Sequence, residues 1–170
     1  MSVLRGAALC LLVLVAVILQ VAVLRYVAVD GVVPNLALLL VVFAGFTRGP
    51  QFAAVMGLGA GLVLDLAPPA DHVAGRWALA LVVVGYLAGR VGREARSTLP
   101  ASLLTVGACS FVGTSLYALS GLVTGDERMS PDQMLVVIAV SVGWDVLVTP
   151  VVMPLACSAL RRLRPPRVAY

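Results

Sequence analysis

The sequence predicts an all-α polytopic membrane protein with six transmembrane helices and with both ends of the chain in the cytoplasm. Three observations lead to this prediction. The 170 residues are 61% hydrophobic and only 12% charged, whereas a soluble domain typically carries about 25% charged residues. The apolar residues form six runs separated by charge, proline or glycine. The arginines lie mostly on one side of the membrane that these runs would cross.

Helices explain the six runs better than strands do. A segment inside a bilayer must satisfy its own backbone N–H and C=O groups, so helices and closed barrels are the structures that cross it. Barrel strands alternate apolar and polar residues, but these runs are continuously apolar. We therefore expect one integral membrane domain over residues 1–170, with a basic cytoplasmic tail over residues 161–170. The predicted helices are Gly6–Leu24, Val32–Phe46, Phe52–Leu66, Trp77–Val91, Leu99–Val123 and Met134–Leu160.

The first run follows Arg5, as the apolar part of a signal peptide would. However, a signal peptide has an apolar stretch of about 7–15 residues and a small-residue cleavage site after it. This run is longer, and Arg25 follows it without a clear cleavage site. We therefore expect a retained first membrane helix.

The second and third runs are separated by Arg48-Gly49-Pro50. A single helix across this segment would place Pro50 in its interior at a cost of about 3 kcal/mol, so we expect a break. Each run has about 15 residues and would be roughly 22 Å long as a helix, whereas the hydrocarbon core is about 30 Å thick. Two alternatives remain, short buried helices or a re-entrant hairpin, and both leave the later orientation unchanged.

The arginines determine the predicted orientation. With the N-terminus in the cytoplasm, nine of the twelve arginines fall inside, as the positive-inside rule prefers. Those inside are Arg5, Arg48, Arg90, Arg93, Arg96, Arg161, Arg162, Arg164 and Arg167, and those outside are Arg25, Arg76 and Arg128. Of the acidic residues, Glu94 falls inside and most others fall outside. The arginines lie at the ends of apolar runs without interleaved aromatic residues, so the net charge of +4 indicates a membrane surface and not nucleic acid.

The residue types that usually perform catalysis are sparse. Cys10, Cys109 and Cys157 lie in apolar runs at unrelated spacings, so we interpret them as small buried hydrophobes and not as a disulfide or metal framework. His72 is the single histidine, and it lies beside Asp71 in a predicted external loop. No nucleophile elbow, zinc motif, P-loop or dinucleotide fingerprint is present. We expect no enzymatic activity, cofactor or metal.

Two adjacent predicted helices carry glycines at four-residue spacing. Gly57 and Gly61 share one face of the third helix with Asp65, and Gly85 and Gly89 repeat the spacing on the fourth. Small residues at this spacing let another helix backbone approach closely. We expect a close helix contact, either between these two helices or with a partner protein.

Asp65 ends the glycine face of the third helix. One interpretation places its carboxylate in the outer headgroup zone, and another places it in a polar contact where two helices touch. Arg76, just past Pro68-Pro69, is its candidate ionic partner.

Asp145 lies near the middle of the last run with no basic residue within two helical turns. A charge there costs about 2.5–3.5 kcal/mol, so Asp145 should be protonated, hydrogen-bonded or beside water. A structural polar seam, a ligand site and a proton site remain as alternatives. Ser141 and Thr149 share its face, and we expect Pro150 and Pro154 to break the helix after it. The candidate polar partners are Gln20, Ser110, Thr114 and Ser115.

The order of these features resembles the rod shape-determining protein MreD family over nearly the whole chain. The matching pieces are Pro34-Asn35, Arg48-Gly49-Pro50, GLGAGLVLDL (residues 57–66), GYLAGR (residues 85–90) and WDVLVTPVVMPL (residues 144–155) before an arginine-rich tail. An asparagine often stands in the family where Asp145 stands here, which implies that a charge is not required there.

The resemblance implies a non-catalytic scaffold in the bacterial cytoplasmic membrane that helps to control cell shape and peptidoglycan synthesis. Its expected partner is the bitopic protein MreC, and through it the MreB cytoskeleton and the cell-wall glycan polymerase and transpeptidase. The family is also similar to the six-helix substrate-binding subunits of energy-coupling-factor transporters. A vitamin- or small-solute-binding subunit, with Gln20 and Asp145 as ligand groups, is therefore the alternative function.

Overall fold

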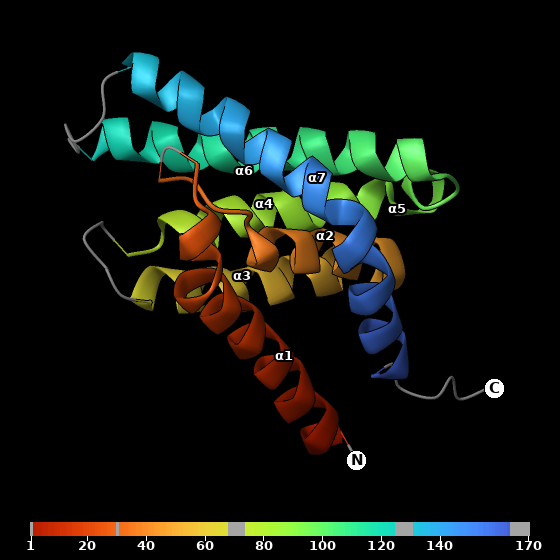
Figure 1. Ribbon diagram of the computed structural model, residues 1–170. Coiled ribbons are helices and arrows are strands. Elements are labelled where there is room, and N and C mark those ends of the chain that lie inside the picture. Colours follow the sequence, from red (N-terminus) through yellow and green to blue (C-terminus); the bar gives the residue numbers. More distant parts are fainter. Residues whose placement is uncertain (1, 30, 68–73, 125–130, 164–170) are drawn as a thin grey trace.

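The computed structural model describes residues 2–29, 31–67, 74–124 and 131–163, and within these ranges the chain is helical without a strand (Figure 1). This confirms the all-α prediction. The six main helices are α1 (Ser2–Ala22), α2 (Leu36–Arg48), α3 (Pro50–Leu66), α4 (Arg76–Arg90), α6 (Leu99–Val123) and α7 (Pro131–Arg162). Two short helices, η1 (Leu24–Val27) and α5 (Gly92–Ala95), lie between them. Asp71, His72 and most of the basic tail fall outside the described residues.

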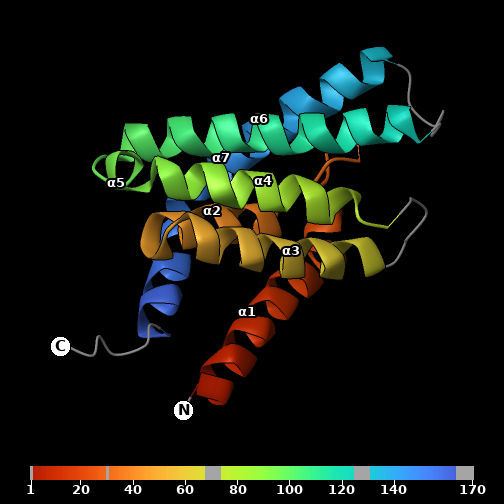
Figure 2. The same cartoon turned by 180° about the vertical axis from the view of Figure 1, so that it is seen from behind.

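Two helices, α6 and α7, are long and apolar enough to cross a membrane. The apolar stretches of α1, α2 and α3 are shorter. Along the main helices the chain direction alternates, so that the beginning of α1 and the end of α7 lie at the same end of the molecule (Figures 1 and 2).

The centre of the bundle is α2, whose residues from Leu36 to Thr47 are all buried. The helices α1, α3, α4 and α7 pack around it, and α4 lies between α3 and α6 (Figure 2). In contrast, α1 projects from the other helices, and its buried apolar side chains are Val13 and Val17 (Figure 1). The side of α1 that faces away carries exposed apolar residues, including Leu11 and Ile18.

The break between α2 and α3 lies where the sequence predicts it. Gly49 has φ 92°, a conformation that side-chain-bearing residues rarely adopt, and it ends α2. Pro50 then begins α3 at a position where the missing N–H costs nothing, because the first helical N–H groups have no partner inside the helix. The two helices therefore fold back on each other as a tight pair.

The expectation that Pro150 and Pro154 break the last helix is wrong. The helix α7 continues through both prolines to Arg162 and bends instead (Figure 1). Its last turns are held by packing, because Cys157 and Leu160 are buried against the core. This packing, together with the bend, accommodates the two missing backbone N–H groups.

Candidate functional site

The glycines of α3 lie directly against the backbone of α4. A Cβ atom added to Gly57 would lie 2.7 Å from the carbonyl carbon of Leu81, and one added to Gly61 would collide with the backbone of Ala78. Gly59, on the outward side of the same helix, has nothing within 4 Å of such an atom. Of the three glycines, only Gly57 and Gly61 are therefore required to be small by the contact between α3 and α4.

The glycines of α4 make the reciprocal contact. A Cβ atom added to Gly85 would lie 2.7 Å from the carbonyl carbon of Ala53, and one added to Gly89 would collide with Pro50. The four predicted glycines thus come together in one antiparallel helix pair. The sequence does not single out Gly45 of α2, whose added Cβ atom would lie 2.7 Å from the backbone nitrogen of Gly89. The glycine four residues after it, Gly49, lies at the break after α2 and not on a helix face.

Asp65 holds the beginning of α4. Its side chain is only 2% exposed. One carboxylate oxygen, Oδ2, accepts hydrogen bonds from the backbone N–H of Gly75 at 2.9 Å and of Ala78 at 3.1 Å, and Oδ1 accepts one from Trp77 at 3.1 Å. The first N–H groups of a helix have no partners within the helix, and the helix dipole favours a negative charge near them. Asp65 is thus a cap at the contact between two helices, as one of the two interpretations expected.

Arg76 joins α4 to α6. Its Nε donates to the Ser120 hydroxyl at 3.2 Å, and its Nη2 donates to the carbonyl oxygen of Tyr117 at 2.9 Å. The guanidinium carbon lies 4.2 Å from the centre of the Tyr117 ring, and the Trp77 ring stacks on that ring at 4.4 Å. Gly121 provides the space that the guanidinium group occupies. The sequence predicts Arg76 as an outside arginine and a candidate partner of Asp65, and it does not predict this link to α6.

Asp145 is fully buried and touches two other helices. Its Oδ1 accepts a hydrogen bond from the backbone N–H of Asn35 at 2.7 Å, immediately before α2. Its Oδ2 accepts a hydrogen bond from the Ser110 hydroxyl of α6, also at 2.7 Å. Both carboxylate oxygens therefore have donors, which offsets the cost of burying the group.

Gln20 and Asn35 complete the polar cluster at the beginning of α2. The side-chain oxygen of Gln20 accepts from the backbone N–H of Ala37 at 3.3 Å, and that of Asn35 accepts from Leu38 at 3.0 Å. Side chains from α1 and α7 thus bind backbone N–H groups at the beginning of a helix that is buried on all sides. The sequence gives one signal for this arrangement, because asparagine before an apolar run is a preferred helix cap.

The other predicted partners of Asp145 do not bind its carboxylate. The Thr114 hydroxyl donates to the carbonyl oxygen of Ser110 at 2.7 Å, and the Thr149 hydroxyl donates to that of Asp145 at 2.6 Å. Both threonine hydroxyls therefore donate to a carbonyl oxygen of their own helix and not to the Asp145 carboxylate. Ser141 is buried and Ser115 is half-buried.

The cysteines form no cluster. Cys109 and Cys157 are buried, as expected, but Cys10 is exposed on α1, so its interpretation as a buried residue is wrong. It lies on the face of α1 that no other described helix covers. Across the described ranges, no group of three or more histidine, cysteine, aspartate or glutamate residues could hold a metal ion.

Comparison of the chain with family models, with curated proteins and with solved structures found no match. The contacts themselves are therefore the basis for a functional proposal. In the described residues, the two buried aspartates connect one helix to another, and so do the five glycines at which an added Cβ atom would lie closer than 3.0 Å to the backbone of another helix.

Proposed function

We propose that this chain is a non-catalytic scaffold subunit of the bacterial cell elongation machinery. It would act through an MreC-like bitopic membrane protein and, through that partner, on an MreB-like cytoskeleton and the enzymes of peptidoglycan synthesis. One observation supports this proposal most strongly. Several of the residues that carry the resemblance to MreD are residues at which helices contact each other, including Asn35, Gly57, Gly61 and Asp65.

The proposal includes six membrane crossings with both ends of the chain in the cytoplasm. The alternating chain direction of the main helices supports it (Figure 2). So does the distribution of the arginines. The short helix α2 need not match the thickness of the bilayer, because its sides are covered by protein and not by lipid.

The alternative function, a vitamin- or small-solute-binding transporter subunit, rests on Gln20 and Asp145 as ligand groups. Each side chain accepts a hydrogen bond from a backbone N–H at the beginning of α2, Asp145 from Asn35 and Gln20 from Ala37. A ligand that used these side chains would have to replace those bonds. The observed contacts therefore favour a structural role, and native mass spectrometry of the purified protein tests the alternative by searching for a bound small molecule.

The scaffold proposal is tested by co-purification of a tagged MreC-like protein from the same bacterium in mild detergent. The informative variant is Gly61→Leu, because a side chain at Gly61 meets the backbone of Ala78 and should force α3 and α4 apart. We expect at least about tenfold lower recovery of the complex. The matched control is Gly59→Leu, which adds the same side chain to the open side of the same helix and should leave recovery unchanged.

Two results would count against the proposal. Normal abundance and normal partner recovery with Gly61→Leu would show that the glycine contact is not needed, and the proposal would then lose the observation that supports it most strongly. Recovery of an ATPase module by the unaltered protein, without an MreC-like protein, would instead favour the transporter alternative.

A further inference from the structure

The last turns of α7 are joined to the rest of the helix at a weak point. We call residues 155–162, which follow both prolines of the helix, the arm. Proline has no backbone N–H, so Pro150 and Pro154 each leave the carbonyl group four residues earlier without its usual donor in the helix. The helix bends here, and the arm turns toward the end of α2 (Figure 1). The backbone of α7 is therefore weakest just before the arm.

Arg48, the last residue of α2, holds the other end of the arm. Its Nη2 donates a hydrogen bond to the carbonyl oxygen of Leu160 at 2.9 Å. The last four carbonyl groups of a helix have no N–H partner within the helix, and the helix dipole favours a positive charge near them. Since α7 ends at Arg162, the carbonyl group of Leu160 is one of these four. A side chain of α2 thus caps the end of α7.

The guanidinium group of Arg48 also contacts α3. Its central carbon lies 4.4 Å from the centre of the Phe52 ring, within the range of a cation–π contact. Phe52 lies in the first turn of α3, directly after the break at Gly49 and Pro50. Arg48 therefore connects the arm to two helices of the bundle.

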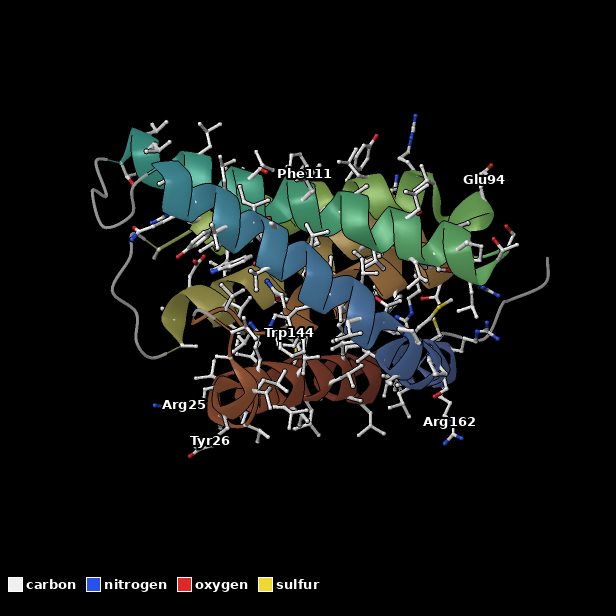
Figure 3. All side chains as sticks on the ribbon, turned by 45° about the horizontal axis from the view of Figure 1, so that its top comes forward. Arg25, Tyr26, Glu94, Phe111, Trp144 and Arg162 are labelled. Atoms are coloured by element: carbon white, nitrogen blue, oxygen red, sulfur yellow. The ribbon has the colours of Figure 1, made fainter. Side chains whose placement is uncertain are left out.

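The arm packs on the core through a narrow inner face. Ala156 and Cys157 are only 6% and 7% exposed and Leu160 is fully buried, whereas Leu155 is exposed on the outer face. Alanine and cysteine side chains bury little apolar surface, so each contributes less to packing than a leucine does. The exposed side chain of Arg162 extends away from the other helices (Figure 3). We therefore expect the hydrogen bond from Arg48 to provide a large share of the attachment of the arm.

We propose that the arm is a strap, hinged at Pro150 and Pro154 and latched by Arg48, that opens and closes over the end of α2. The structure shows the closed position. Opening breaks the hydrogen bond between Arg48 and Leu160 and uncovers the inner face of the arm, while the rest of the bundle stays folded. The proposal goes beyond the scaffold function and does not depend on it.

Cys157 reports the opening of the strap, because its side chain is buried on the inner face of the arm. The test measures how fast N-ethylmaleimide labels this thiol in the full-length protein in mild detergent, with mass spectrometry of the peptides. Arg48→Met removes the hydrogen-bond donors and the charge and keeps an apolar side chain. Labelling of Cys157 should become at least about tenfold faster, as expected for the loss of a hydrogen bond from a charged group. Cys109, which is buried on α6, should keep its labelling rate.

Arg162→Met is the matched control, because it makes the same change in a side chain that extends away from the bundle. It should leave the labelling rate of Cys157 unchanged. Phe52→Leu is a milder variant, which removes only the ring beside the guanidinium group of Arg48. It should raise the labelling rate of Cys157 about two- to fivefold.

Three results would overturn the proposal. The first is an unchanged labelling rate of Cys157 in Arg48→Met, and the second is an equal acceleration in Arg162→Met. The third is faster labelling of Cys109 together with Cys157 in both Arg48→Met and Phe52→Leu. In that case the arm would open only when the whole bundle unfolds, and it would not be a strap.

Discussion

Asp65 and Asp145 are both buried, and both accept hydrogen bonds at the beginning of another helix, Asp65 from three backbone N–H groups and Asp145 from one. They differ in how far apart along the sequence the bonded residues lie. Asp65 binds residues that lie ten to thirteen positions along the chain, at the turn between α3 and α4. Asp145 binds Asn35, which is 110 positions away, and also binds Ser110 of α6.

The difference shows that the same side chain can define a local turn or hold the whole bundle together. Asp65 lies at the end of α3, and two of its three described hydrogen bonds are only partly buried. If Asp65 is removed, water can take over part of its hydrogen bonding to the N–H groups of Gly75 and Trp77. Asp145 lies inside α7 with both oxygens engaged in buried hydrogen bonds, so water cannot easily replace it.

The largest expected effect comes from Asp145→Ala. This change leaves the Asn35 N–H and the Ser110 hydroxyl without their acceptor in a buried site, and we expect it to lower the free energy of unfolding by about 2–4 kcal/mol. Asp145→Asn keeps one acceptor oxygen and should cost about 1 kcal/mol. Denaturant-induced unfolding in detergent measures both. An Asp145→Ala protein as stable as the unaltered one would show that the long-range cap contributes little.

Asp65→Ala should have a smaller effect. It removes the cap of α4, and loss of a helix cap typically costs about 1–2 kcal/mol. Thermal unfolding should show a lower midpoint than that of the unaltered protein and a higher one than that of Asp145→Ala. If Asp65→Ala proves to be the more damaging of the two, the contrast between a local and a long-range cap is wrong.

The smallest effect is expected for Ser110→Ala, which removes one of the two donors to Asp145. We expect a loss of about 1 kcal/mol, the typical contribution of one hydrogen bond. Ser115→Ala, a half-buried position on the same helix, is the control and should change stability by less. Combining Ser110→Ala with Asp145→Ala should cost little more than Asp145→Ala alone, because both changes remove the same bond.

Several elements were predictable because their signals are local. The Arg48-Gly49-Pro50 break follows from the backbone preferences of glycine and proline. The glycines of α3 and α4 were found through their four-residue spacing, although the spacing alone did not identify the opposing helix.

What could not be predicted depends on contacts between distant parts of the chain. The partners of Asp145 include the backbone N–H of Asn35, and a pattern of side chains cannot show a backbone donor. The helix α7 continues past Pro150 because its last turns pack on α2, and local preference alone predicts a break there. Gly45 was missed because its neighbour, Gly89, is known only from the fold.

The most direct test of the long-range cap is hydrogen exchange, followed by mass spectrometry, on the peptide that covers residues 34–40 in detergent. We predict slow exchange at the beginning of α2 in the unaltered protein and in Asp65→Ala, since that variant disturbs a different helix. Asp145→Ala should exchange much faster there. Fast exchange in the unaltered protein, or equal protection after Asp145→Ala, would contradict the account of Asp145 as the group that holds α2 in place.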